Sequence, residues 1–418
     1  MTMKLRNRLI ALVCLILFLG IGAALFLTST SGKPFAVILF VADNISPQML
    51  TATRLFSGGG DARLQLEDFP NFALCRNAAN DFSVPDSASS STALASGKRV
   101  NRNSLGMDPG GLKLESLLET AAAKGRSTGL VTTGRITGVT TAAYYAKTLN
   151  PDDKEDLLLQ YGAHTPFDFV AGGGAKDFEG DPSTAAGKAM KQLTDKGVVI
   201  LKSTGDLDAQ PFWKKVPVLG LLSPGPLASF RLGEGNPDAP SLADLVRVAI
   251  KHLQSDRKGY LLVVDDPQVG DAARLNDAET TFNRLLAFDQ AVSTARRYAG
   301  ENSLIIVSGR ENIGGLQLNG YPFLRDKGVA ILALNTQGIP SISWSTGPGF
   351  ASERNPADLH SKKTNAPVGI LSQPTSFALP AALGTAGDVL TLGEGQGSEK
   401  LKGFLDLTDV NKVIVEKL

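Results

Sequence analysis

Three charged side chains stand close after apolar stretches of the chain, where strands are expected to end. Asp43, Asp265 and Arg310 follow apolar runs at 35–41, 259–264 and 303–307 respectively. In a parallel α/β sheet the functional groups gather at the carboxyl ends of the strands, so these side chains are expected to lie together. Carboxylates bind hard cations such as magnesium, and a guanidinium holds phosphate through two parallel hydrogen bonds. Side chains of these types suit a site for a cation or a phosphate group.

The elements that must position these side chains alternate between strand and helix. Further strands are predicted at 127–133, 167–171 and 198–201, and helices at 112–124, 242–254 and 277–299. Another helix is predicted to begin at Ser46 and Pro47, because serine caps helix N-termini and proline fits the first turn. Such alternation indicates a mainly parallel central sheet with helices on both faces. The predicted fold class is therefore α/β.

The composition suits a large folded domain and gives no sign of a nucleic-acid partner. The chain has 418 residues, enough for one large α/β domain or two smaller ones, and a formal net charge of only +1. Cys14 lies in an apolar N-terminal stretch, so the folded part has the single thiol of Cys75 and no internal disulfide is expected. Histidines are scarce, with only His164, His252 and His360 in the whole chain.

The serine-rich segment 84–98 carries the most specific family resemblance. Its sequence Asp86-Ser87-Ala88 resembles the nucleophile segment of alkaline phosphatases, in which the serine opens a helix and attacks phosphorus. Three more segments resemble the bacterial members of that family, at 130–137, 171–174 and 397–406. The resemblance implies an alkaline-phosphatase-like sandwich and a phosphate or phosphoester ligand. Because family members are often dimers, it also implies a homodimer.

The resemblance further implies one magnesium site. The ligand that the family places after its first strand corresponds to Asp43, its threonine ligand to Thr140, and its glutamate to the shorter Asp265. Oxygen ligands suit a hard cation, and a water molecule can bridge the methylene lost between glutamate and aspartate. One magnesium ion held by Asp43, Thr140 and Asp265 is therefore expected. The alternative is a hydrogen-bonded polar cluster that remains from a shared ancestry.

The zinc ligands of the family are largely replaced. The family holds two zinc ions with carboxylates and three histidines. Of these ligands, this chain retains only Asp43. Other residue types stand at the remaining ligand positions, namely Gly270, Arg274, Arg310, Glu311 and Gly384. Shifting the register by one residue recovers Asp271 as a carboxylate but puts Leu275 at a histidine position. Neither register supplies an imidazole, so zinc is not expected.

These replacements lead to two hypotheses about function. In the first, the protein is a catalytically inactive or strongly weakened homologue that binds a phosphate-like anion near Ser87, Arg274 and Arg310. In the second, it is an active phosphomonoester hydrolase in which Ser87 is the nucleophile, one magnesium ion remains, and the arginines replace zinc. Arginines stabilise charge on a transferring phosphoryl group, but they do not generate an alkoxide as zinc does. The first hypothesis is therefore favoured.

A purely structural interpretation of the same residues stays open. Asp86 and Ser87 would then serve only to cap a helix. The two arginines would pair with the nearby carboxylates, which are those of Asp43, Asp265 and Glu311. Such pairs would fill the former metal sites and keep the carboxylates from being buried without a partner.

Residues 1–32 are expected to lie outside the folded domain. Basic residues precede an uncharged apolar run at 9–27, which is just long enough to span a bilayer. Basic residues before a span place the N-terminus in the cytoplasm, so the domain at 33–418 is expected outside it, on a membrane anchor. A cleaved signal peptide and secretion are the alternative, because small residues follow at 29–32. Within the domain, the irregular region 317–380 corresponds to a variable insertion of the family.

Overall fold

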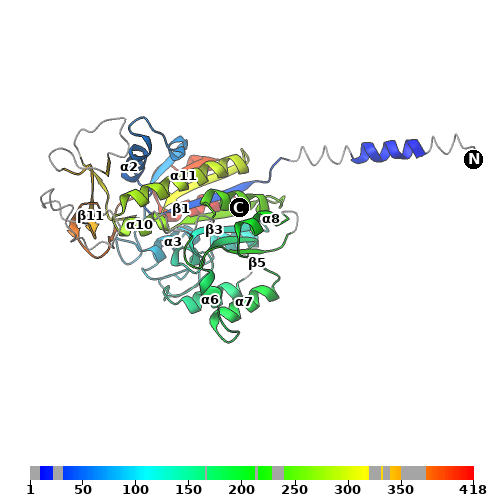
Figure 1. Ribbon diagram of the computed structural model, residues 1–418, viewed down its shortest axis with the longest axis horizontal. Helices are drawn as coiled ribbons and strands as arrows, with labels where there is room; N and C mark the ends of the chain where they lie inside the picture. The colour runs from blue at the N-terminus through cyan, green and yellow to red at the C-terminus, as the bar shows by residue number, and fades with distance from the viewer. Residues whose placement is uncertain are drawn as a thin grey trace, which may run out of the picture.

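A ten-stranded sheet forms the centre of the molecule in the computed structural model, which describes residues 10–21, 32–164, 167–211, 215–227, 240–319, 331–332, 339–349 and 373–418 (Figure 1). The strand order is β15 (Gly403–Asp406), β2 (Asn71–Arg76), β14 (Val389–Gly395), β8 (Ser303–Gly309), β1 (Ala36–Ala42), β7 (Tyr260–Asp266), β3 (Ser127–Arg135), β4 (Phe169–Gly173), β6 (Val218–Leu221) and β5 (Val199–Leu201). The run from β8 to β5 is parallel throughout, while β14 runs antiparallel to β8 and β2. The prediction of a mainly parallel central sheet is confirmed.

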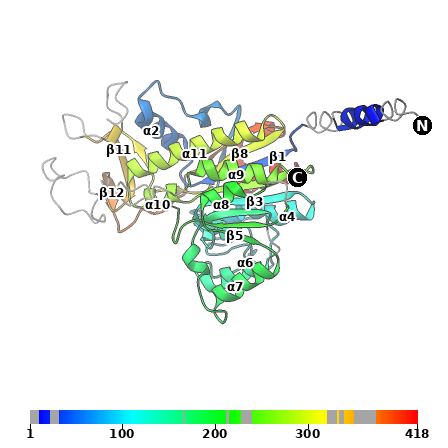
Figure 2. The ribbon, with the colours of Figure 1, turned by 45° about the vertical axis from the view of Figure 1, so that its right-hand side comes forward.

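Helices cover both faces of this sheet. One face carries α2 (Pro47–Gly58), α9 (Leu242–Leu253) and α11 (Ala278–Ala299), and the other carries α3 (Ser87–Ser96), α4 (Leu117–Ala123), α6 (Lys154–Ala163), α7 (Ala185–Asp195) and α12 (Leu407–Val415). Figures 1 and 2 show α2 and α11 at the upper side of the molecule and α6 and α7 at the lower side. A short helix, α8 (Thr204–Ala209), packs near the β5 edge.

The central strands are apolar on both faces because both faces are covered. Along β1, Ile38 and Phe40 join the core on one side of the sheet, while Val37 and Leu39 join the core on the other. This division follows from the alternation of side chains along a strand. It explains why the sequence here reads as a continuous apolar run rather than an alternating one.

The sequence predicted most central elements but misplaced the start of one helix. The capped helix start at Ser46 and Pro47 is confirmed, since the Ser46 hydroxyl accepts a hydrogen bond from the amide of Met49. The helix predicted at 112–124 begins only at Leu117, so its predicted start was wrong. Ser116 and Glu119 form a capping box, in which each side chain accepts a hydrogen bond from the other residue's amide. Two reciprocal bonds fix the helix start at that point.

Two predictions concern regions that the structure covers only in part. Residues 10–21 form a helix with exposed side chains, and the rest of the predicted span at 9–27 lies outside the described residues. Among the described helices, none combines the length and apolar character needed to cross a bilayer. Much of the predicted insertion at 317–380 also lies outside the described residues. Its described parts contribute to a three-stranded sheet of β10 (Gln317–Leu318), β11 (Ile342–Gly347) and β12 (Thr375–Ala378).

Candidate active site

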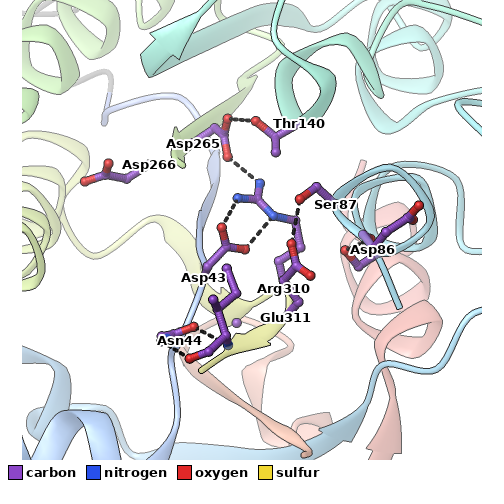
Figure 3. A network of polar contacts seen from close by, with 12 residues as sticks. Asp43, Asn44, Asp86, Ser87, Thr140, Asp265, Asp266, Arg310 and Glu311 are labelled. Carbon is purple, nitrogen blue, oxygen red and sulfur yellow. Dashed lines mark hydrogen bonds and ion pairs between the residues drawn. The ribbon is translucent and has the colours of Figure 1, made fainter. Parts of the chain in front are cut away.

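Ser87 is the first residue of α3 and lies beside the carboxyl ends of the central strands (Figure 3). The preceding Asp86 caps the helix, because its carboxylate accepts a hydrogen bond of 2.8 Å from the amide of Ser89. The Ser87 side chain is half-buried, and its hydroxyl donates a 2.5 Å hydrogen bond to Oε1 of Glu311. Helix capping therefore belongs to Asp86, and the Ser87 hydroxyl is directed at a carboxylate.

Arg310 follows the end of β8 and is only 1% exposed. Its Nε and Nη2 donate to the two oxygens of Asp43, at 2.9 and 3.0 Å, and its Nη1 donates to Oδ1 of Asp265 at 2.7 Å. Figure 3 shows the guanidinium lying between the two carboxylates. Burial alone would lower the pKa of Arg310, but the charges and hydrogen bonds of Asp43 and Asp265 outweigh burial and raise the pKa above its ordinary value. The arginine is therefore a fixed cation at the end of the central strands.

Threonine hydroxyls complete the surroundings of Asp265. Its Oδ2 accepts a hydrogen bond of 2.6 Å from Thr140, which lies in α5 (Val139–Ala142), and further contacts of 3.3 Å from Thr132 and Thr141. The structure thus brings together Asp43, Thr140 and Asp265, the three residues of the predicted magnesium site. They meet around a guanidinium.

This arrangement does not fit a magnesium ion. Asp43 directs both of its oxygens at Arg310, while Asp265 directs Oδ1 at Arg310 and Oδ2 at the Thr140 hydroxyl, so the oxygens do not converge on a shared centre. Magnesium needs several oxygen ligands converging on one point. Within the described ranges, no group of three or more histidine, cysteine, aspartate or glutamate side chains could hold a metal ion.

Gly270 shows how closely α10 (Gln268–Arg274) packs on Asp43. A Cβ atom at this position would lie 2.1 Å from Oδ2 of Asp43, closer than two unbonded atoms can approach. The carboxylate bound to Arg310 therefore occupies the space that a ligand side chain at position 270 would need. At Gly384 the packing is less tight, because a Cβ atom there would lie 3.3 Å from Oε2 of Glu311.

Glu311 links Ser87 to Arg274. Its side chain is 2% exposed, and the oxygen that accepts the Ser87 hydrogen bond also accepts one of 3.1 Å from Nη2 of Arg274. Burial, followed by the charge of Asp43, raises the pKa of Glu311 to about 7, against the opposing effects of Arg274 and the Ser87 hydroxyl. Arg274 stands at the end of α10 with 36% of its side chain exposed. Of the two predicted anion-binding arginines, it is the one that meets solvent.

A turn after β1 holds the site in place. Asn44 has a positive φ of 61°, a conformation that asparagine tolerates better than most residues. Its side chain donates to the carbonyl of Ile313 at 3.0 Å and accepts from the Ile313 amide at 2.7 Å, while its own amide donates to the carbonyl of Glu311. These bonds join the end of β1 to the segment that follows Arg310.

The two histidines that the structure describes make contacts with residues outside this site. His252 is in α9 beside the Phe169 ring, and burial lowers its pKa. His164 is the C-cap of α6, and its Nε2 lies 3.3 Å from the carboxylate of Glu119. His360 lies outside the described residues.

Sequence reasoning missed the contact between Ser87 and Glu311. The position of Glu311 directly after Arg310 placed it near the site, but a strand-end position does not say which neighbour a carboxylate will face. Thr132 and Thr141 were missed as well. Their signal was the cluster of threonines at 132–141, beside the predicted ligand Thr140.

Comparison with known proteins gives consistent matches along the chain. Alkaline phosphatase 4 of Bacillus subtilis is 28% identical over 296 residues, which is 68% of this chain and 62% of that protein. The tissue-nonspecific alkaline phosphatase of Gallus gallus is 26% identical over 380 residues, covering 75% of this chain and 71% of that protein. The match to the Bacillus protein thus spans less than two thirds of that relative's length.

Solved structures share the fold. Alkaline phosphatase from the Antarctic bacterium TAB5 superposes with a TM-score of 0.71 at 21% identity, covering 92% of this chain and 98% of that one. The cold-active enzyme of Shewanella gives a TM-score of 0.72 at 21% identity, with 92% and 99% covered. The family model described as alkaline phosphatase matches residues 36–418. With its fold and its sequence in agreement over nearly the whole domain, the chain belongs to the alkaline phosphatase family.

Proposed function

We propose that this family member is a catalytically inactive or strongly weakened homologue for phosphomonoesters, and that it binds a phosphate-like anion. The observation that carries the proposal is the buried guanidinium of Arg310 between Asp43 and Asp265. At this place a fixed organic cation stands where the family resemblance calls for metal ligands. A guanidinium balances carboxylate charge but does not lower the pKa of an attacking hydroxyl as a bound metal does.

The energetics of the buried arginine support this proposal. A cation could enter between Asp43 and Asp265 only if Arg310 gave up its three hydrogen bonds. Breaking a buried ion pair by removing one partner costs about 3–5 kcal/mol, because a charge is left buried without compensation. We propose in addition that the zinc positions have lost their function, because Arg274 and Glu311, which stand at two of them, bind each other.

The proposed anion contact is Arg274 rather than Arg310. Arg310 is buried and engaged by two carboxylates, whereas Arg274 meets solvent and, among the described residues, its guanidinium donates one hydrogen bond, to Glu311. The N-terminus of α3 adds backbone donors near Ser87. Nearby carboxylates oppose an anion, so its affinity should be weak and should rise when Glu311 is protonated below pH about 7.

Sulfate binding to the full chain tests the proposed anion contact. Sulfate is the probe because it keeps its charge between pH 6 and 8. Isothermal titration should show tighter binding at the lower pH and loss of binding in Arg274→Gln. Arg247→Gln is the matched control, since Arg247 is an arginine of α9 paired with Asp208 away from Ser87. Binding that survives Arg274→Gln unchanged would contradict the proposed contact.

One observation favours the second candidate function, an active phosphomonoester hydrolase with a rearranged, zinc-poor site. The 2.5 Å bond from the Ser87 hydroxyl to Glu311 provides a carboxylate that could accept the hydroxyl proton without a metal ion. In this case 4-nitrophenyl phosphate would be hydrolysed slowly, and Ser87→Ala would abolish the turnover. The magnesium ion that the sequence predicts has no part in this candidate function, because Arg310 binds Asp43 and Asp265, two of the ligands expected for that ion.

A further inference from the structure

Ser87, Glu311 and Arg274 form a chain of contacts, of which the proposed anion binding uses only the Arg274 guanidinium. The Ser87 hydroxyl donates to Oε1 of Glu311 at 2.5 Å, and Arg274 donates to the same oxygen at 3.1 Å. A hydroxyl, a base within hydrogen-bond reach, and a third group that orients the base form the general pattern of an activated nucleophile. Ser87 is half-buried and Glu311 is buried, so the base is shielded while the hydroxyl retains some exposure.

The fold fixes both members of this pair. Ser87 begins the ten-residue helix α3, whose N-terminal end is capped by Asp86. The positive end of a helix dipole stabilises negative charge that develops at the first turn. Glu311 directly follows Arg310, and its carbonyl accepts a 2.8 Å hydrogen bond from the amide of Asn44. Neither side chain depends on a long surface loop for its position.

The charge around the pair decides which substrates it suits. Three arginines, Arg274, Arg284 and Arg310, face five carboxylates, which are those of Asp43, Asp265, Asp266, Asp271 and Glu311. Desolvation and then the charge of Asp43 raise the pKa of Asp271. Carboxylates outnumber guanidinium groups, which weakens the binding of a doubly charged phosphate ester at the reacting position, as it weakens the binding of any anion at Arg274. An uncharged ester does not meet this repulsion.

We propose that Ser87 and Glu311 form a nucleophile and base pair that attacks uncharged carboxylic esters. The proton of the Ser87 hydroxyl moves to Glu311 as the bond from Oγ to the carbonyl carbon forms. The bond to the leaving oxygen then breaks, and that oxygen takes the proton back from Glu311. Water hydrolyses the acyl-Ser87 ester with Glu311 again accepting the proton, which releases the acid and restores the hydroxyl.

The test uses the full chain and 4-nitrophenyl acetate. We expect release of 4-nitrophenol together with an acetyl group on Ser87, found by intact mass and peptide mapping. Ser87→Ala should lose both signals, whereas Ser96→Ala, a control in the same helix, should retain them. Equal ester turnover in the Ser87→Ala protein, or none in the folded wild-type chain, would overturn the proposal.

Glu311 is tested separately, because Ser87 could react without it. Glu311→Gln keeps the side chain's shape but loses its basicity, and it should lower the rate of Ser87 acetylation by roughly 100-fold or more, since a general base contributes about 100- to 10,000-fold. The wild-type rate should rise with pH through about 7 as the carboxylate ionises. A Glu311→Gln protein with the wild-type rate and pH profile would remove Glu311 from the proposal.

The acetylation test and the sulfate-binding test can fail independently of each other. Acetylation of Ser87 in a protein that binds no sulfate would support this inference and contradict the anion contact. Sulfate binding without acetylation would do the reverse. Hydrolysis of 4-nitrophenyl phosphate faster than that of the acetate would contradict the charge argument on which the substrate class rests.

Discussion

At the scale of single residues, Arg310 gives the site its character. A guanidinium binds two carboxylates at once through planar, directed hydrogen bonds, which a lysine could not match. It thereby neutralises part of the charge that a metal would otherwise balance. The sequence suggested pairing of this kind as an alternative to anion binding, and the Arg310 guanidinium forms ion pairs with Asp43 and Asp265.

Removing this arginine should destabilise the fold. Arg310→Met would leave Asp43 and Asp265 buried with no cation between them, at a cost of about 3–5 kcal/mol. Arg274→Met is the matched control, because its partly exposed ion pair should contribute under about 1 kcal/mol. Urea denaturation measures both free energies of unfolding. Equal losses in the two variants would contradict a special role for Arg310.

Glu311 should make the stability depend on pH in a predictable direction. Its pKa is raised from 4.5 to about 7 in the folded protein, so the folded state binds the proton more tightly than the unfolded state. This contribution to stability is complete below the unfolded pKa and is lost as the pH rises through the folded one. Wild type should therefore lose stability relative to Glu311→Gln between pH 5 and pH 8. Melting temperatures at the two pH values measure the difference, and an unchanged difference would speak against a raised pKa.

At the scale of elements, the turn after β1 holds the site together. The buried side chain of Asn44 makes two hydrogen bonds with the backbone of Ile313, from a residue of positive φ. The central strands themselves were predictable, because strands buried on both faces read as apolar runs. The partners of Asn44 were not, because a turn residue does not reveal which distant segment it binds.

Asn44→Ala should cost about 2–4 kcal/mol, from two lost buried hydrogen bonds and a strained backbone. Asn103 provides a control for the strain alone, since it also has a positive φ, of 56°, but its side chain is exposed. Asn103→Ala should cost clearly less in the same urea denaturation. Similar losses at both positions would mean that the bonds to Ile313 contribute little.

At the scale of the whole molecule, a large family fold carries a site for which we propose changed chemistry. The family resemblance predicted the architecture because its segments are spread along the chain, from the central strands to the C-terminal segment 397–406. It predicted the residues of the site but not their contacts, since side-chain pairing depends on three-dimensional register. The edge strand β15 and its neighbour β2 were also missed, because their side chains are only partly buried and follow no continuous apolar run. The homodimer and the location outside the cytoplasm remain predictions from sequence.

The central claim is that Arg310 has taken over from metal ions and that metal-dependent phosphomonoester hydrolysis is lost or strongly weakened. The most direct measurement is elemental analysis of the purified full chain, with a 4-nitrophenyl phosphate assay on the same sample before and after adding zinc and magnesium. We predict far less than one metal ion per chain and little or no turnover under either condition. About two zinc ions per chain with turnover that Ser87→Ala abolishes, as in a two-metal mechanism, would contradict the account.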